Sequence, residues 1–172
     1  MCLFITLVVS KNNREEMRNI NDEPFLVYKN RHLSDQIPQD YIYGRATSHY
    51  CDCDSYFNGL SRDEKEDGGN KIHKLVKKGW SSQKIKRYKA DKEKRKERDA
   101  RSGELARKDW FNFLRTLLTV KKIKSVGILT HFYSGSLEAE RVQLKEIVKI
   151  RFNEIDDSVL ESIEEDKLYL FV

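Results

Sequence analysis

The chain has 172 residues, of which 35% are charged and 38% hydrophobic, and its formal net charge at pH 7 is +5. This length favours one domain with an extension, and no apolar run approaches the roughly 20 residues that a membrane span requires. The apolar start, MCLFITLVVS, has neither the basic flank nor the small-residue cleavage site of a signal peptide. We therefore expect a cytoplasmic protein without a membrane partner, in which cysteines are reduced thiols or metal ligands.

The first third of the chain predicts three strands and one short helix. The continuous apolar run at 2–9 indicates a central strand buried on both faces. Aromatic and β-branched residues favour further strands, and the last of them runs directly into a cysteine segment. The other expected elements are a helix at 11–22, strands at 24–29 and 41–48, and a glycine-containing loop at 57–70.

The middle of the chain predicts a basic helical arm. A helix over 71–78 ends at Gly79, which is suited to a left-handed C-cap, and Ser81 or Ser82 caps the next helix. That helix continues with almost no apolar face, RSG at 101–103 is a candidate break, and 110–120 is strongly apolar. Residues 71–108 carry sixteen Lys or Arg and five Asp or Glu, a net charge of +11, so the rest of the chain sums to −6. We expect this polar stretch at the far end of the arm.

The last third predicts two strands, a capped helix and a final strand. Residues 125–135 read as a buried strand ending in a loop, a turn and a strand follow within 137–152, and 167–172 closes the chain as a strand. A helix over 156–166 has Asp157 or Ser158 as its N-cap. The pattern indicates one α+β or mixed α/β domain, 1–172, whose single central sheet carries the arm at about 70–122 as an insertion.

Two of the three cysteines lie in SHYCDCDS, residues 48–55. If this segment is extended, His49, Cys51 and Cys53 point to one face, and the two thiols stand at or beyond disulfide reach. Thiolates and an imidazole suit zinc, so zinc is a possible cofactor, with Cys2 as the fourth ligand and His131 in reserve. A one-residue gap is shorter than the usual Cys-x2–4-Cys spacing. Small buried thiols and catalytic or redox thiols are the alternatives.

Cys2 also has the position of an N-terminal nucleophile. If Met1 is removed, the α-amine of Cys2 could act as the base that activates its thiol. This layout, with GRATS at 44–48 and Asn58-Gly59, resembles the class II glutamine amidotransferases. The resemblance implies Cys2 as nucleophile, Arg45 as the group that holds a substrate carboxylate, and Asn58 with the Gly59 amide as the oxyanion hole.

A second resemblance extends over nearly the whole chain. The fragments MCLF, CDC, GWSSQKI and HFYSG together resemble a family of uncharacterised bacterial proteins. The resemblance implies that these fragments belong to one domain design, and it implies no activity.

The segment HFYSG places His131, Tyr133 and Ser134 at the end of a strand, with Glu138 and Glu140 just beyond. Such residues at a strand end could bind phosphate or perform acid–base work, and a polar turn with a satisfied histidine is the alternative. If the strands that begin at Cys2 and end at His131 are antiparallel neighbours, the two form a candidate thiol–imidazole pair.

The basic arm predicts an anionic partner, either nucleic acid or an acidic protein surface, although a merely solvated arm is the alternative. The turn KKGWSSQKIKR resembles a helix-turn-helix in outline, and Trp80 and Tyr88 could stack on bases or pack the hairpin. The candidate contacts are Lys77, Lys78, Lys84, Lys86, Arg87 and Lys89.

Two functions follow from these features. The first is a binding protein with a thiol-rich, possibly zinc-binding site and a basic arm for an anionic partner. The alternative is a cysteine-dependent amidohydrolase or transferase with Cys2 as nucleophile and His131 or the terminal amine as base.

Overall fold

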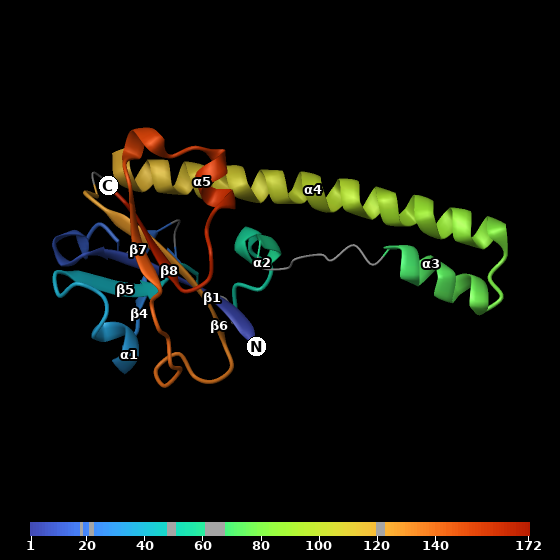
Figure 1. Cartoon of the computed structure of the whole chain (residues 1–172). Helices are drawn as coiled ribbons and strands as arrows, with labels where there is room; N and C mark the ends of the chain where they lie inside the picture. The colour runs from blue at the N-terminus through green and yellow to red at the C-terminus, as the bar shows by residue number, and fades with distance from the viewer. Residues whose placement is uncertain (18, 21–22, 48–50, 61–67, 120–122) are drawn as a thin grey trace.

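The computed structural model describes residues 1–17, 19–20, 23–47, 51–60, 68–119 and 123–172, and it shows an α+β body from which a helical arm extends (Figure 1). The strands are β1 Cys2–Ser10, β2 Asn19–Ile20, β3 Glu23–Pro24, β4 Leu26–Val27, β5 Tyr41–Arg45, β6 Val126–Tyr133, β7 Glu146–Ile150 and β8 Lys167–Phe171. The α-helices are α1 Arg31–Ser34, α2 Tyr56–Leu60, α3 Gly68–Lys77, α4 Ser82–Thr119 and α5 Asp157–Glu161.

One mixed six-stranded sheet organises the body, with the strand order β4-β5-β1-β6-β8-β7. β1 runs antiparallel to both of its neighbours, β5 and β6, whereas β7 and β8 are parallel. The register places Cys2 opposite Tyr133 and Phe4 opposite His131. The expectation that the strands carrying Cys2 and His131 are antiparallel neighbours is therefore confirmed.

β1 is buried on both faces of the sheet, as its continuous apolar sequence predicts. Leu3, Ile5 and Leu7 belong to the core beneath α4 and α5. Val8 belongs to a second core on the opposite face, where α1 contributes Leu33. Because each fully buried aliphatic side chain contributes about 1.5–3 kcal/mol, β1 is a rigid base for any site built at its end.

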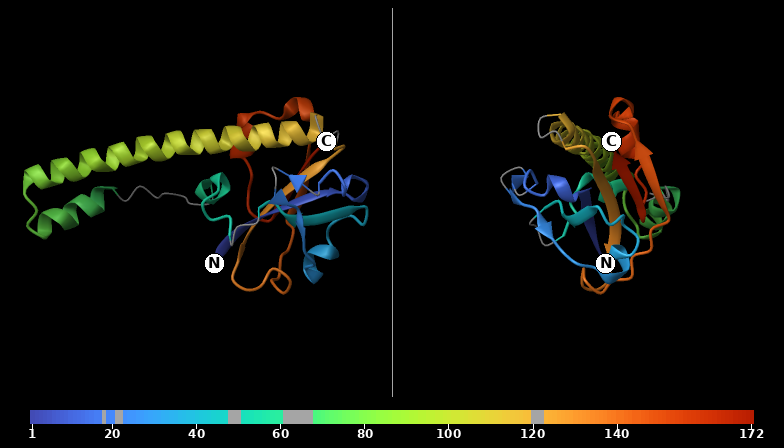
Figure 2. Two further views of the ribbon diagram at one scale, coloured as in Figure 1. Left: turned by 180° about the vertical axis from the view of Figure 1, so that it is seen from behind. Right: turned by 90° about the vertical axis from the view of Figure 1, so that its left-hand side faces the viewer.

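The arm is dominated by α4, a single helix of 38 residues. Its C-terminal part packs on the body through the buried Leu114 and Leu117, while its N-terminal part extends away from the sheet beside α3 (Figure 2). Every residue from 89 to 102 is exposed. The polar stretch therefore lies along α4 behind the far end, which the turn between α3 and α4 forms, so the expectation that it lies at the far end is wrong.

The expected break at 101–103 is wrong, because helix α4 runs through Gly103 without interruption. A glycine inside a helix costs only about 1 kcal/mol, which the favourable residues around it offset. The start of α4 was predicted correctly. The Ser81 hydroxyl accepts a hydrogen bond from the Lys84 amide, and Gly79 has a φ of 77°.

Three further expectations need correction. The helix expected at 11–22 is instead a 3-10 turn over Lys11–Asn13, followed by β2, and Met17 is buried between them. The short helix α2 lies at the start of the loop expected at 57–70, and the short helix α1 lies between the strands expected at 24–29 and 41–48. Asp156 rather than Asp157 or Ser158 caps α5, since its carboxylate accepts the amides of Ser158 and Val159.

Within the described part of the chain, no helix combines the length and the apolar character needed to cross a membrane. Helix α4 has the length but is charged along most of it.

Candidate thiol metal site

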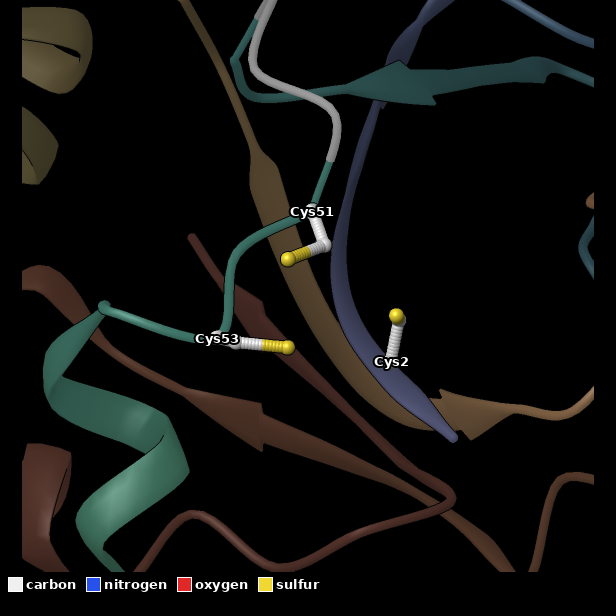
Figure 3. Close-up of side chains that lie close together, drawn as sticks. All are labelled: Cys2, Cys51 and Cys53. Carbon is white, nitrogen blue, oxygen red and sulfur yellow. The ribbon is translucent and has the colours of Figure 1, made fainter.

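The three cysteines, Cys2, Cys51 and Cys53, come together beside the N-terminal end of β1. Their sulfur atoms all lie within 4.8 Å of one another, and we refer to them as the thiol cluster. Cys2 comes from the start of β1, while Cys51 and Cys53 come from the segment that leads into α2 (Figure 3). None of the three is in a disulfide. The cluster therefore joins two segments that are far apart in the sequence.

Asp52 positions this segment against β1. Its amide donates to the Leu3 carbonyl at 2.9 Å, and its carboxylate accepts the Ile5 amide at 2.8 Å. The Thr47 hydroxyl donates to the same carboxylate at 2.5 Å. Asp52 is only 4% exposed, so these bonds compensate for burying its charge. Because Asp52 replaces β5 as the partner of β1 here, its two flanking cysteines are held beside Cys2.

The far side of the cluster is connected to the arm. The Asn58 amide group donates to the Cys53 carbonyl within the turn that starts α2. Phe57 of α2 packs edge-on against Trp110 of α4, with ring centroids 4.9 Å apart. The segment that carries two of the three thiols therefore leads directly into the contact between α2 and the base of α4.

Two thiols of the cluster have perturbed pKa values. Hydrogen bonds from the Cys53 amide and then from the Cys53 thiol lower the pKa of Cys51. The same thiol contact raises the pKa of Cys53, because Cys53 is the donor in it, and partial burial adds to that rise. One proton thus stays with Cys53 while Cys51 becomes the preferred thiolate, which is the form that binds metals and attacks electrophiles.

The geometry of the cluster suits a thiophilic metal ion. With Zn–S bonds of about 2.3 Å, the sulfurs of a tetrahedral site lie about 3.8 Å apart. The observed sulfurs, all within 4.8 Å of one another, reach that separation with small side-chain movements. Three of the four predicted ligands, Cys2, Cys51 and Cys53, are therefore brought together. The remaining predicted ligand, His49, lies outside the described residues.

His131, the reserve ligand, belongs to a different cluster. Its Nδ1 lies 2.5 Å from Asp166 Oδ1 and 3.8 Å from Glu165 Oε1, and Lys145 Nζ lies 3.3 Å from the other Asp166 oxygen. Within the described residues, His131 Nε2 is buried and has no hydrogen-bond partner. Asp166 has a φ of 64°, which is uncommon for a residue other than glycine. This arrangement orients the imidazole through Nδ1 and partly neutralises Asp166.

The Tyr133 ring packs edge-on against His131, with ring centroids 4.7 Å apart, but the hydroxyls of Tyr133 and Ser134 have other partners. The Tyr133 hydroxyl lies 3.3 Å from that of Tyr28, and burial raises the pKa of Tyr133 well above its ordinary value, so it stays protonated. The Ser134 hydroxyl donates to Glu140 at 3.1 Å. The polar groups of His131, Tyr133 and Ser134 therefore have different hydrogen-bond partners.

Glu140 closes the turn after β6. Its carboxylate accepts the Gly135 amide at 2.7 Å and the Ser134 amide at 3.2 Å. Partial desolvation raises the pKa of Glu140, but these hydrogen bonds outweigh it and the net shift is downward. Glu138 is exposed.

Two residues named through the amidotransferase resemblance have structural contacts. The Arg45 guanidinium lies over the Phe4 ring, 4.8 Å from its centroid. Asn58 donates to Cys53 as described above, and Gly59 lies in α2.

The six candidate cations occupy the end of the arm. Lys77 ends α3, Lys78 lies in the turn, and Lys84 lies 4.3 Å from the Trp80 ring centroid. The remaining three lie on the exposed first turns of α4: Lys86, Arg87 and Lys89. Trp80 and Tyr88 pack edge-on against each other at 6.0 Å, as the hairpin-packing interpretation expects.

The sequence interpretation missed the residues that hold the site in place. The extended reading of the cysteine segment assigns no role to Asp52, and the helix expected at 156–166 places Asp166 at its end. The only available signal for Asp52 was its position between two cysteines. Asp166 had none, because its contact with His131 depends on the pairing of β6 with β8.

No protein-family model, no curated protein and no solved structure matches this chain.

Proposed function

We propose that this protein is a binding protein whose thiol cluster holds zinc or another thiophilic metal ion and whose basic arm engages an anionic partner. The observation that carries the metal site is the convergence of three sulfurs within 4.8 Å from two distant segments. Thiolate ligands favour ions of this class. The fourth position of a tetrahedral ion is left for a further ligand.

The metal site and the arm are physically connected in this proposal. A metal bound by Cys2, Cys51 and Cys53 fastens the start of β1 to the segment preceding α2. Because that segment leads into α2, whose Phe57 contacts Trp110, the bound metal stabilises the attachment of α4. Binding to the folded state alone stabilises a protein by mass action, so metal and fold are coupled.

Zinc content tests the proposal. The intact protein is purified under reducing conditions, loaded with zinc and dialysed, and its zinc and free thiols are quantified. We expect one zinc per chain and thiols protected from titration. Cys51→Ser and Cys2→Ser should each lose most of the zinc, whereas Asp54→Asn, an exposed neighbour, should retain it. Three freely reacting thiols in the presence of zinc would contradict the metal site.

A second candidate function has two supporting observations. His131 is oriented by Asp166 at 2.5 Å, as a general base requires. It also lies two residues along β6 from Tyr133, the register partner of Cys2, on the same sheet face. This arrangement favours a cysteine-dependent amidohydrolase or transferase with Cys2 as nucleophile. Its test is the rate at which iodoacetamide modifies Cys2 in the wild type and in His131→Asn. A slower reaction in the variant supports the pair, and an equal rate contradicts it.

A further inference from the structure

One face of α4 carries a row of cations along its exposed N-terminal half. Positions 84, 87, 91, 94, 98 and 101 alternate in spacing between three and four, which keeps them on one side of an α-helix. All of them except Asp91 are cations, and all are exposed. We call the five cations the cationic stripe: Lys84, Arg87, Lys94, Arg98 and Arg101.

The opposite face of the same segment has a different charge pattern. Lys89, Lys92 and Lys96 lie there, and Glu93 and Glu97 flank them. The row that holds the cationic stripe therefore has five cations and one acidic residue, Asp91, whereas the opposite side has three cations and two acidic residues. The ion pair of Arg98 with Asp99, at 3.7 Å, joins side chains that are 75% and 73% exposed, so it is weak.

The cationic stripe lacks the apolar contacts that a protein partner needs. Residues 89–102 include only alanines among apolar types, so this segment has no hydrophobic seam for a partner helix or groove. The core of a protein–protein interface is depleted of charged residues. A polyanion needs no such seam, because Lys and Arg contact its phosphates directly.

Shape favours a duplex over a single strand. At about 1.5 Å per residue the cationic stripe spans about 25 Å in a straight line, and the exposed helix is about 10–12 Å wide. The major groove of B-DNA, about 12 Å wide, admits a helix of this size, whereas the groove of duplex RNA is deep and narrow. Single strands are bound through aromatic stacking. The arm's Trp80 and Tyr88 instead pack on each other.

From these observations we infer that α4 binds double-stranded DNA through the cationic stripe, by contacts to phosphates that do not depend on sequence. The inference rests on the proposed function, of which it names the anionic partner. Five phosphate contacts give a slope of about −4.5 for the logarithm of the association constant against the logarithm of salt concentration. Affinity then falls about 500-fold between 50 and 200 mM salt.

Two double variants of the full-length protein test this inference by fluorescence anisotropy with a labelled DNA duplex. Arg98→Gln and Arg101→Gln together remove two stripe cations. Lys92→Gln and Lys96→Gln remove the same charge from the opposite face. We expect the first double variant to reduce the salt effect to about 40-fold and the second to leave it near 500-fold. Circular dichroism checks that both retain the helix.

The competitors separate this inference from the broader proposal. Duplex DNA should displace the probe at lower concentration than duplex RNA, single-stranded DNA or poly-glutamate. If the two double variants weaken binding equally, or if RNA or poly-glutamate binds better than DNA, the inference is wrong but an anionic partner stands. If the wild type binds none of these polyanions at 50 mM salt, the anionic-partner part of the proposed function fails as well.

Discussion

Two regions of α4 are stabilised in different ways. From Trp110 onward the helix is held by the core, through Leu114, Leu117 and the contact with Phe57. Over residues 89–102 nothing packs on it, and helix propensity and charge spacing must sustain it. The thiol cluster lies at the first kind of region and the cationic stripe at the second. A metal site requires ligands held in place by rigid elements, whereas a long polyanion requires an extended, solvent-exposed surface.

The largest expected effect comes from replacing leucine by alanine at a buried and at an exposed position of α4. Leu114 is fully buried, whereas Leu105 on the same helix is 58% exposed. Leu114→Ala should lower the free energy of unfolding by about 2–5 kcal/mol, because it leaves a cavity in the core. Leu105→Ala should change it by less than about 0.5 kcal/mol. Urea unfolding measures both, and similar losses would mean that the arm is packed against something.

The next effect concerns how firmly the thiol cluster is built into the body. Asp52→Ala removes the acceptor for the buried Ile5 amide and should cost about 1–3 kcal/mol. It should also weaken zinc binding, because Cys51 and Cys53 lose their anchor beside Cys2. Asp54→Ala, which removes an exposed carboxylate from the same segment, is the matched control. Zinc affinity unchanged in Asp52→Ala would show that the cluster does not depend on this anchor.

A smaller effect distinguishes the sulfurs within the cluster. The pKa of Cys51 is lowered by hydrogen bonds from Cys53, and that of Cys53 is raised by the same contact. In metal-free protein at neutral pH, Cys51 should therefore be alkylated by iodoacetamide before Cys53, and zinc should slow both reactions. Peptide mass mapping over time gives the order. Faster labelling of Cys53 would contradict the assigned direction of the hydrogen bond.

The smallest effect is a pH dependence at the turn after β6. Because the folded-state pKa of Glu140 is lowered, its contribution to stability is present above a pH of about 4.3 and is lost as pH falls through the folded value. Glu140→Gln should reduce the difference in thermal stability between neutral and acidic pH. Glu138→Gln, at an exposed position, should leave that difference as in the wild type.

Much of the body could be predicted from the sequence because its strands are strongly patterned. The apolar run of β1 and the Gly79 turn were sufficient to place a central strand and the hairpin. The α+β class was likewise predicted correctly. The length of α4 was not, because Gly103 is a local signal and the helix is sustained by the packing of its distant C-terminal end.

The sequence predicted the ligands of the candidate site but not the residues that hold them in place. Residue types and spacing identified Cys2, Cys51 and Cys53, and the structure brings their sulfurs together. The role of Asp52 depends on where β5 leaves β1, and that of Asp166 on the pairing of β6 with β8. Such contacts depend on how strands distant in the sequence pair in the folded protein, and a single sequence does not reveal that pairing.

X-ray absorption at the zinc edge tests the central claim most directly, because it counts the ligands of the bound ion. For the zinc-loaded wild type, we predict three sulfur neighbours at about 2.3 Å and one lighter neighbour. Cys53→Ser should show one sulfur fewer. A wild-type spectrum with fewer than three sulfurs would contradict the thiol cluster as the metal site.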